Sequence, residues 1–196
     1  MYQLIILGTM NQLHNKQFQR INVVGASGSG KSTFSRKLST ILSIPHVEMD
    51  AIFWCPNWQE PEEGVFVSKL SAKISSLSCW VLDGNYTRTI PIKWKNVQVV
   101  IWLDYSFIRT VFQAIKRSFT RAFSQKELWA GTGNKETWRR LFSKDSIVLY
   151  TIKTHNKVKR KHELLMLDNS YSQLEFVRLR SPKEAEQFLN RIKELS

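Results

Sequence analysis

The sequence predicts an α/β fold, a mostly parallel sheet with helices on both faces. Short apolar runs alternate along the chain with longer segments of helical character, and this alternation is typical of parallel sheets covered by helices. A glycine-rich turn ending in Gly-Lys-Ser also joins the first strand to the first helix. The 196 residues, 42% of them apolar, suit one globular domain.

The sequence of the first half predicts two strands, two helices and one irregular stretch. A buried strand covers 21–24, and a helix covers 31–42 after the glycine-rich turn. A short second strand spans 46–49, and the stretch 52–58 that follows is irregular because a proline breaks it. Proline and two glutamates then open a helix over about 61–77.

The second half adds three strands and two helices. Apolar runs predict strands over 80–82, 97–103 and 174–179. A helix follows the fourth strand over about 106–123. Ser-Pro-Lys-Glu opens the last helix, about 182–195, with serine as the N-cap and proline at the first helical position.

Two segments lie outside this regular alternation. Residues 124–134 form a loop with Gly-Thr-Gly-Asn turn chemistry, and a long helical segment returns over 135–165. We expect a single domain over 20–196 with a lid at about 118–140. Residues 1–19 have no obvious core role and are either a loose, disordered extension or the product of an upstream translation start.

The turn from Gly25 to Ser32 fits the phosphate-binding pattern G-x-x-x-x-G-K-[ST] without a mismatch. Its glycines let backbone N–H groups point at a phosphate, and the following helix N-terminus adds partial positive charge. Lys31 can reach the β- and γ-phosphates of ATP, and the Ser32 hydroxyl can ligate Mg²⁺. An ordinary Gly/Ser turn is the alternative. The residues predicted to hold the nucleotide are Gly25, Ser27, Gly28, Ser29, Gly30, Lys31, Ser32 and Thr33.

Aspartates follow three of the predicted strands. Ligands of open parallel sheets bind at the carboxyl ends of the strands, where this chain carries Asp50, Asp83 and Asp104. Asp83 is the candidate for the Mg²⁺ side, and Asp50 is the candidate binder or proton acceptor for the substrate that receives the phosphate. Asp104 is a weaker candidate, because a strand-terminal aspartate can also form a turn or cap a helix.

Arginines flank the same region. Phosphoryl transfer needs cations around the transferring group. Arg88 can hold an acceptor phosphate, while Arg117, Arg121, Arg139 and Arg140 bracket the loop and can close over ATP and exclude water. Each of them can alternatively be plain surface charge.

Three aromatic residues, Phe53, Trp54 and Trp58, come soon after Asp50. They can stack on a ring of the acceptor or belong to the core, and the core interpretation suits Phe53 better.

Charge and composition limit the other function classes. The formal net charge is +13, and residues 109–161 hold 14 basic and three acidic residues, a net +11. That segment can bind nucleic acid, close over nucleotide phosphates, or form a solvated helical surface. No apolar run suits a membrane span, and residues 2–10 do not read as a signal peptide. Cys55 and Cys79 lack metal-ligand spacing, which favours reduced thiols and a cytoplasmic location.

Two further segments resemble a known family. Met49-Asp-Ala-Ile-Phe-Trp54 and Val81-Leu-Asp-Gly-Asn-Tyr86, taken with the phosphate loop, resemble the adenylate-kinase-like P-loop proteins labelled DNA topology modulation proteins. The resemblance runs over about 21–189. It implies a three-layer nucleoside-kinase-like fold with strand order 2-3-1-4-5 and a mobile helical lid. Gln113 departs from the arginine that adenylate kinases usually carry there.

The resemblance also implies roles for particular residues. Lys31 and Ser32 would contact ATP and Mg²⁺, Asp83 would lie near the metal, Arg88 near the acceptor, and Arg117 on the ATP phosphates. The leading hypothesis is therefore an ATP- and Mg²⁺-dependent phosphotransferase for a small acceptor. The alternatives are a nucleotide-dependent regulator that binds nucleic acid through 109–161, and a nucleotide-binding protein without kinase activity. The sequence leaves the acceptor and the oligomeric state open.

Overall fold

The computed structural model describes residues 19–195, and it contains one five-stranded sheet. The predicted extension 1–19 lies outside the described residues except for Gln19. The strands are β1 (Arg20–Gly25), β2 (His46–Glu48), β3 (Trp80–Asp83), β4 (Val99–Leu103) and β5 (Glu175–Leu179). They pair in the order β2-β3-β1-β4-β5, and every pairing is parallel. The predicted fold class and strand order are therefore confirmed.

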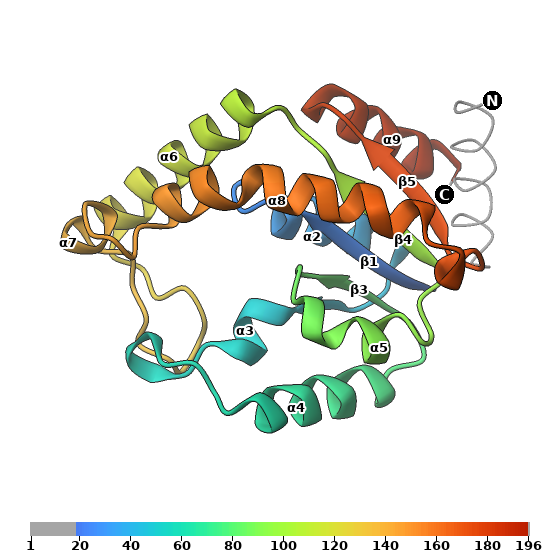
Figure 1. Cartoon of the computed structure of the whole chain (residues 1–196), viewed down its shortest axis with the longest axis horizontal. Coiled ribbons are helices and arrows are strands. Elements are labelled where there is room, and N and C mark those ends of the chain that lie inside the picture. The colour runs from blue at the N-terminus through green and yellow to red at the C-terminus, as the bar shows by residue number, and fades with distance from the viewer. Residues whose placement is uncertain (1–18, 196) are drawn as a thin grey trace.

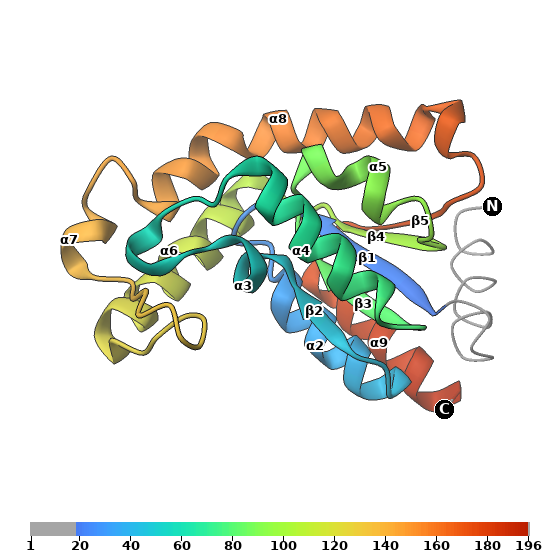
Figure 2. The same cartoon turned by 90° about the horizontal axis from the view of Figure 1, so that it is seen from below.

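Helices cover both faces of the sheet, which gives three layers (Figures 1 and 2). The helices are α2 (Lys31–Leu42), α3 (Met49–Phe53), α4 (Glu63–Ser75), α5 (Ile90–Lys93), α6 (Phe107–Ser124), α7 (Trp138–Leu141), α8 (Ile147–Leu167) and α9 (Pro182–Leu195). In Figure 2, α2 and α9 lie on one side of the sheet, and α5 and α8 lie on the other. The helices that join distant strands therefore enclose the sheet as parallel topology requires.

Each face of the sheet buries its own apolar cluster. On the α2 and α9 face, Phe34 and Phe188 pack with centroids 6.2 Å apart over the central strands. On the opposite face, Phe66 and Leu70 of α4 pack with Trp80 and Trp102 of the sheet. Burial on both faces explains why the strands are continuous apolar runs rather than alternating ones. The sheet is thereby a rigid base for the residues at its carboxyl edge.

The carboxyl edge of the sheet is the edge from which α6, α7 and the first half of α8 extend (Figure 1). In the register of the sheet, Val23 lies beside Asp83 on one side and Ile101 on the other. The phosphate loop, the end of β3 and the end of β4 therefore meet at this edge.

Two sequence predictions about local structure are wrong. The second strand ends at Glu48, and Asp50 lies in the short helix α3, followed by a 3-10 turn at Pro56–Trp58 where an irregular stretch was predicted. The predicted helix from residue 135 begins later, because residues 135–137 continue the loop, with a bridge from Glu127 to Lys135. Thr137 and Ser146 cap α7 and α8, and these caps fix where the helices start.

Candidate active site

The glycines of the phosphate loop are required by close contacts. A Cβ on Gly28 would lie 2.8 Å from the Thr110 carbonyl oxygen and 2.9 Å from the Ala114 Cβ, both on α6. A Cβ on Gly25 would lie 2.7 Å from the Leu103 carbonyl oxygen. Gly30 has open space around it but a φ of +88°, which a side chain rarely adopts. The loop therefore packs against β4 and α6 with its backbone.

The other loop positions divide into buried and open groups. Ser29 is buried with no hydrogen-bond partner for its hydroxyl in the described part of the chain. Ser27 and Ser32 are partly exposed, and Thr33 is exposed in the first turn of α2. N–H groups in the first turn of a helix lack partners within that helix. These polar groups fit the oxygens of a bound phosphate.

Lys31 is the centre of a group of charges from four segments. Its ammonium donates a hydrogen bond to the Ala26 carbonyl oxygen at 3.1 Å. Burial lowers the pKa of Lys31, the carboxylates of Asp50 and Asp83 oppose that shift, and the charge of Arg117 adds to it. The structure thus brings the loop lysine within electrostatic range of both predicted carboxylates and of one predicted arginine.

Asp83 ends β3 with its side chain buried. His46 Nε2 lies 3.5 Å from Asp83 Oδ2, and this oxygen accepts no hydrogen bond from the described residues. No group of three or more His, Cys, Asp or Glu side chains in the described part of the chain could hold a metal. A carboxylate and the Ser32 hydroxyl still fit Mg²⁺, because that ion takes its other ligands from phosphates and water.

Asp50 is held by Tyr86, a residue of the Asp-Gly-Asn-Tyr segment to which the sequence assigned no individual role. The Tyr86 hydroxyl donates to Asp50 Oδ1 at 2.7 Å. Burial, and then the Asp50 charge, raise the pKa of Tyr86, so the phenol keeps its proton. Phe53 and Phe66 pack against the Tyr86 ring with centroids 4.7 and 4.9 Å away. The core interpretation of Phe53 is the one the packing supports.

The predicted arginines are not all equivalent. Arg117 reaches the loop, with Nη2 3.5 Å from the Ser27 hydroxyl. Burial, followed by the charge of Arg121, lowers the pKa of Arg117 to about 10, while the charges of Asp50, Glu136 and Glu48 oppose the shift.

Two of the other arginines lie against aromatic rings, and a third is exposed to solvent. Arg88 is exposed, and its guanidinium lies 5.3 Å from the Phe53 ring centroid. Arg140 lies 3.8 Å over the Trp58 ring. Arg139 is exposed on α7, so this structure does not bring it into the group around Lys31.

The loop before α7 is attached to the segment after α3. The Asn134 amide donates to the Cys55 carbonyl oxygen at 2.8 Å and accepts from the Trp58 N–H at 2.9 Å. Trp129 stacks on Trp54 with centroids 6.2 Å apart. We call these contacts the lid clasp, because they join the predicted lid to the segment that carries Asp50.

Glu48 and Glu136 were not anticipated from the sequence. The Trp129 indole donates to Glu48 at 3.3 Å, and burial, followed by the Asp83 charge, raises the Glu48 pKa. Glu136 is buried, and its Oε1 has no hydrogen-bond partner among residues 19–195.

The Asn85 side chain accepts from the Gly25 N–H at 3.0 Å and also donates to the Gly25 carbonyl. Only Asn85 and Tyr86 had a signal, since they belong to the Asp-Gly-Asn-Tyr segment.

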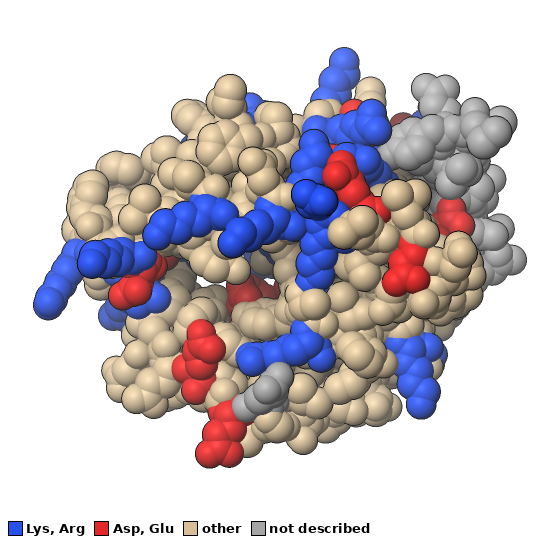
Figure 3. Space-filling view, in the orientation of Figure 1, with Lys and Arg blue, Asp and Glu red and all other residues tan. Residues whose placement is uncertain are grey.

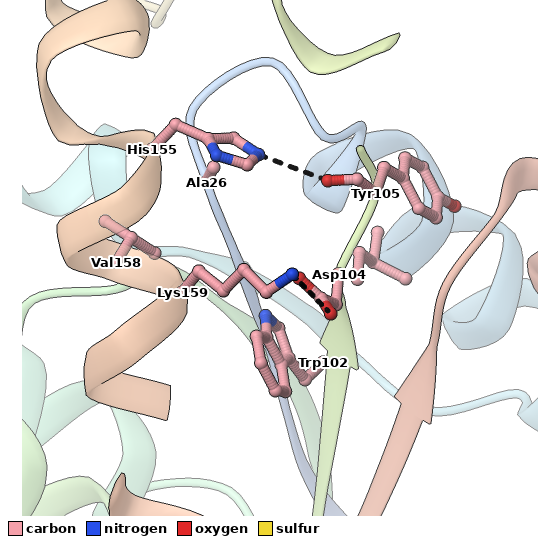
Figure 4. Close-up of a pocket in the computed structure, with 8 residues that line it drawn as sticks. Ala26, Trp102, Asp104, Tyr105, His155, Val158 and Lys159 are labelled. Atoms are coloured by element: carbon pink, nitrogen blue, oxygen red, sulfur yellow. Dashed lines mark hydrogen bonds and ion pairs between the residues drawn. The ribbon is translucent and has the colours of Figure 1, made fainter. Parts of the chain in front are cut away.

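Asp104 belongs to a separate structural network. Arg178 donates to Asp104 Oδ2 through two nitrogens, at 2.9 and 2.6 Å, and Ser106 rather than Asp104 caps α6. Figure 4 shows the small pocket behind the phosphate loop, where Lys159 lies 4.0 Å from Asp104 and His155 Nε2 lies 3.1 Å from the Tyr105 carbonyl oxygen. These contacts attach α8 to the end of β4, and Asp104 is not a member of the group around Lys31.

Comparisons with known proteins establish the fold. No family model and no curated protein matches the chain. A shikimate kinase from Acinetobacter baumannii, solved in complex with shikimate, is 14% identical with a TM-score of 0.56, over 91% of this chain and 92% of the other. A shikimate kinase from Bacteroides thetaiotaomicron is 12% identical with a TM-score of 0.51, over 91% and 98%. A gluconokinase from Sinorhizobium meliloti 1021 is 14% identical with a TM-score of 0.48, over 90% and 94%. The two shikimate kinases, with TM-scores above 0.5, show that the chain has the fold of the P-loop kinases.

Proposed function

We propose that this protein is an ATP- and Mg²⁺-dependent phosphotransferase that acts on the hydroxyl group of a small acceptor. The observation that carries the proposal is that the charges of Asp50, Asp83 and Arg117 act on Lys31, while the Arg117 guanidinium lies 3.5 Å from the Ser27 hydroxyl of the same loop. A phosphate loop alone indicates nucleotide binding, whereas a loop lysine with a second carboxylate and an arginine indicates group transfer. The fold shared with shikimate kinases supports a small-molecule acceptor.

Each residue of the site has its own role in the proposed reaction. Lys31 and Arg117 neutralise charge on the phosphoryl group, and Arg121 is a further cation beside Arg117. Arg139 would add its charge only if closure of the lid moved it toward the group around Lys31. Asp50 accepts the proton of the acceptor hydroxyl, and Arg88 lies on the acceptor side. Ser32 and Asp83 would hold Mg²⁺, which supplies charge neutralisation between the phosphates. The proposed lid, 118–140, excludes water through the lid clasp.

The finer family assignment is also a proposal. The Asp-Ala-Ile-Phe-Trp and Asp-Gly-Asn-Tyr segments, which carry the resemblance to topology modulation proteins, contact each other through Asp50, Phe53 and Tyr86. This mutual contact supports treating the two segments as one acceptor-side unit.

Cys55 and Cys79 are free thiols, in keeping with the predicted cytoplasmic location. No helix among residues 19–195 could cross a membrane.

The test is ADP formation from MgATP across a panel of nucleoside monophosphates, nucleosides, sugars and hydroxy acids. We expect at least one acceptor to stimulate turnover in the wild type and none to do so in Lys31→Met. The matched control is Lys37→Met, on the same helix, whose ammonium lies 3.0 Å from Glu186 on the surface. If no acceptor stimulates the wild type above Lys31→Met, the kinase proposal fails, and MgATP binding by calorimetry then decides whether the protein is only a nucleotide binder.

A second candidate function is nucleic acid binding. Figure 3 shows basic side chains in a row across the face where α8 lies in Figure 1. The exposed basic residues of α8 include Lys153, Lys157 and Arg160. Phosphate contacts make such binding steeply salt-dependent, so affinity for duplex DNA would fall strongly between about 50 and 200 mM salt. Absence of binding at the lower salt concentration removes this candidate.

A further inference from the structure

Lys93 is a buried lysine that the proposed reaction does not use. It ends α5, its side chain is 1% exposed, and its ammonium donates to the Gly84 carbonyl oxygen at 3.1 Å. It makes no ion pair with a carboxylate in the described part of the chain. An ammonium without an opposite charge is costly to bury, because it gives up its hydration.

A second lysine reaches the same loop from another helix. Lys161, on α8, donates to the Thr87 hydroxyl, three residues after Gly84. Unlike Lys93, Lys161 is partly exposed, so solvent reaches this side of the pair. The loop between β3 and α5 therefore contacts an ammonium group from each of two helices.

The two lysines belong to one field of positive charge that extends to the phosphate loop. Burial, and then the charges of Lys161 and Lys31, lower the pKa of Lys93 to about 7. The same three lysines lower the pKa of His162, which burial has already depressed. The carboxylates of Asp50 and Asp83 act on Lys31. The positive charges of Lys93 and Lys161 are thus less balanced by carboxylates than the charge of Lys31.

We propose that Lys93 and Lys161 form a subsite for an anionic group, a carboxylate or a phosphate, carried by the acceptor. The inference rests on the proposed function and narrows its substrate class to hydroxy acids and phosphate monoesters. Lys161 makes the direct contact, and Lys93 supplies the buried charge behind it. The loop that holds the subsite begins directly after Asp83, which places the anionic group beside the phosphate loop.

A purely structural role does not account for the pair. A structural bond to the Gly84 carbonyl needs only a neutral donor, which the uncharged amine of Lys93 already provides, whereas a nearby bound anion would favour the charged ammonium. The Thr87 hydroxyl is next to solvent and needs no lysine to satisfy it. An anion that binds at Lys161, with the charge of Lys93 behind it, explains why two helices each direct an ammonium group at one short loop.

The test compares related acceptors that carry or lack the anionic group, with a non-hydrolysable analogue of MgATP bound. The probe pairs are D-gluconate with D-glucitol, shikimate with its methyl ester, and adenosine monophosphate with adenosine. We expect calorimetry to show at least one anionic member binding about 10-fold or more tighter than its neutral partner. Lys161→Met should reduce that preference to about twofold or less, and the matched control Lys153→Met, on the exposed row of α8, should keep it.

The variants also separate binding from folding. Lys93→Met should lose the same preference while its thermal unfolding midpoint stays equal to or above that of the wild type, because a costly buried charge is removed. The gluconate and shikimate pairs test for binding of a carboxylate, and adenosine monophosphate with adenosine tests for binding of a phosphate. If the wild type binds the MgATP analogue but prefers no anionic probe, or if Lys161→Met keeps the preference, the inference is wrong while the proposed function stands. If the wild type does not bind the MgATP analogue, the proposed function itself fails.

Discussion

Tyr86 donates its phenolic hydrogen to Asp50 over 2.7 Å, and this bond joins the end of β3 to α3. The two residues are 36 positions apart in the chain, and the rings of Tyr86, Phe53 and Phe66 all pack against one another. Because a raised pKa keeps the Tyr86 hydroxyl protonated, it always acts as donor toward Asp50. Tyr86 therefore fixes the orientation of the Asp50 carboxylate, which we propose as the proton acceptor.

Tyr86→Phe should lower kcat about 10-fold and leave the KM for ATP unchanged. The ring and its packing remain, and only the bond that orients Asp50 is lost, an interaction of about 1.5–3 kcal/mol for a charged acceptor. Steady-state kinetics on the best acceptor measure the effect. Tyr171→Phe is the control, because that ring packs on Trp94 at the distance of 4.9 Å and away from Asp50. Equal losses in the two variants would show that the hydroxyl has no orienting role.

The phosphate loop and the strand ends could be predicted because their signals are local. A glycine pattern between a strand and a helix, and an aspartate after an apolar run, are readable without knowing the partner segments. The strand order followed only from the family resemblance. The placement of Asp50 on α3 was missed because five residues are too few to show helical periodicity.

The supporting residues could not be read from the sequence because their roles depend on distant contacts. Lys93 looks like any lysine in a turn, and it is buried only because α5 folds against the sheet. The role of Trp129 depends on its contacts with Glu48 and Trp54, and that of Glu136 depends on its charge acting on Arg117. Arg139 and Arg140 are neighbours in sequence, yet α7 directs only Arg140 onto Trp58.

Gly28→Ala should abolish tight nucleotide binding. The new methyl would lie 2.8 Å from the Thr110 carbonyl oxygen and 2.9 Å from Ala114, at a φ of +85°. Backbone of α6 or of the loop would have to move, so MgATP affinity should fall at least about 10-fold and stability by about 1–3 kcal/mol. Calorimetry and urea unfolding measure the two effects. Gly64→Ala, with open space and an ordinary backbone on α4, should leave nucleotide binding unchanged and raise stability by a few tenths of a kcal/mol.

Asn134→Ala should open the lid clasp. The substitution removes both hydrogen bonds between Asn134 and the segment 55–58. Amide hydrogen exchange over 125–137 should speed up, and ATP hydrolysis without acceptor should rise severalfold, because water enters the site more often. Asn190→Ala, at an exposed position on α9, is the control. Unchanged exchange in Asn134→Ala would show that the loop is held by the tryptophans alone.

His162 should make the protein less stable in mild acid. Its ring stacks on Trp102 at 5.5 Å, Nδ1 lies 2.8 Å from the Val158 carbonyl oxygen, and the positive charges of Lys161 and Lys93 act on it. Burial is the main cause that lowers the pKa of His162 from 6.5 to about 4. The unfolded chain therefore binds this proton first as the pH falls, and the folded state loses stability between about pH 6.5 and 4.

His162→Phe keeps a ring over Trp102 and removes this titration. Other groups titrate in both proteins, so the difference between their unfolding free energies isolates His162. From pH 7.5 to 4.5 the wild type should lose roughly 2–3 kcal/mol more than the variant. Urea unfolding at steps of pH measures the two curves. Parallel curves would mean that the His162 ring is protonated as easily in the folded protein as in the unfolded chain. Burial beside Trp102 and the charges of the neighbouring lysines would then not lower the pKa of His162.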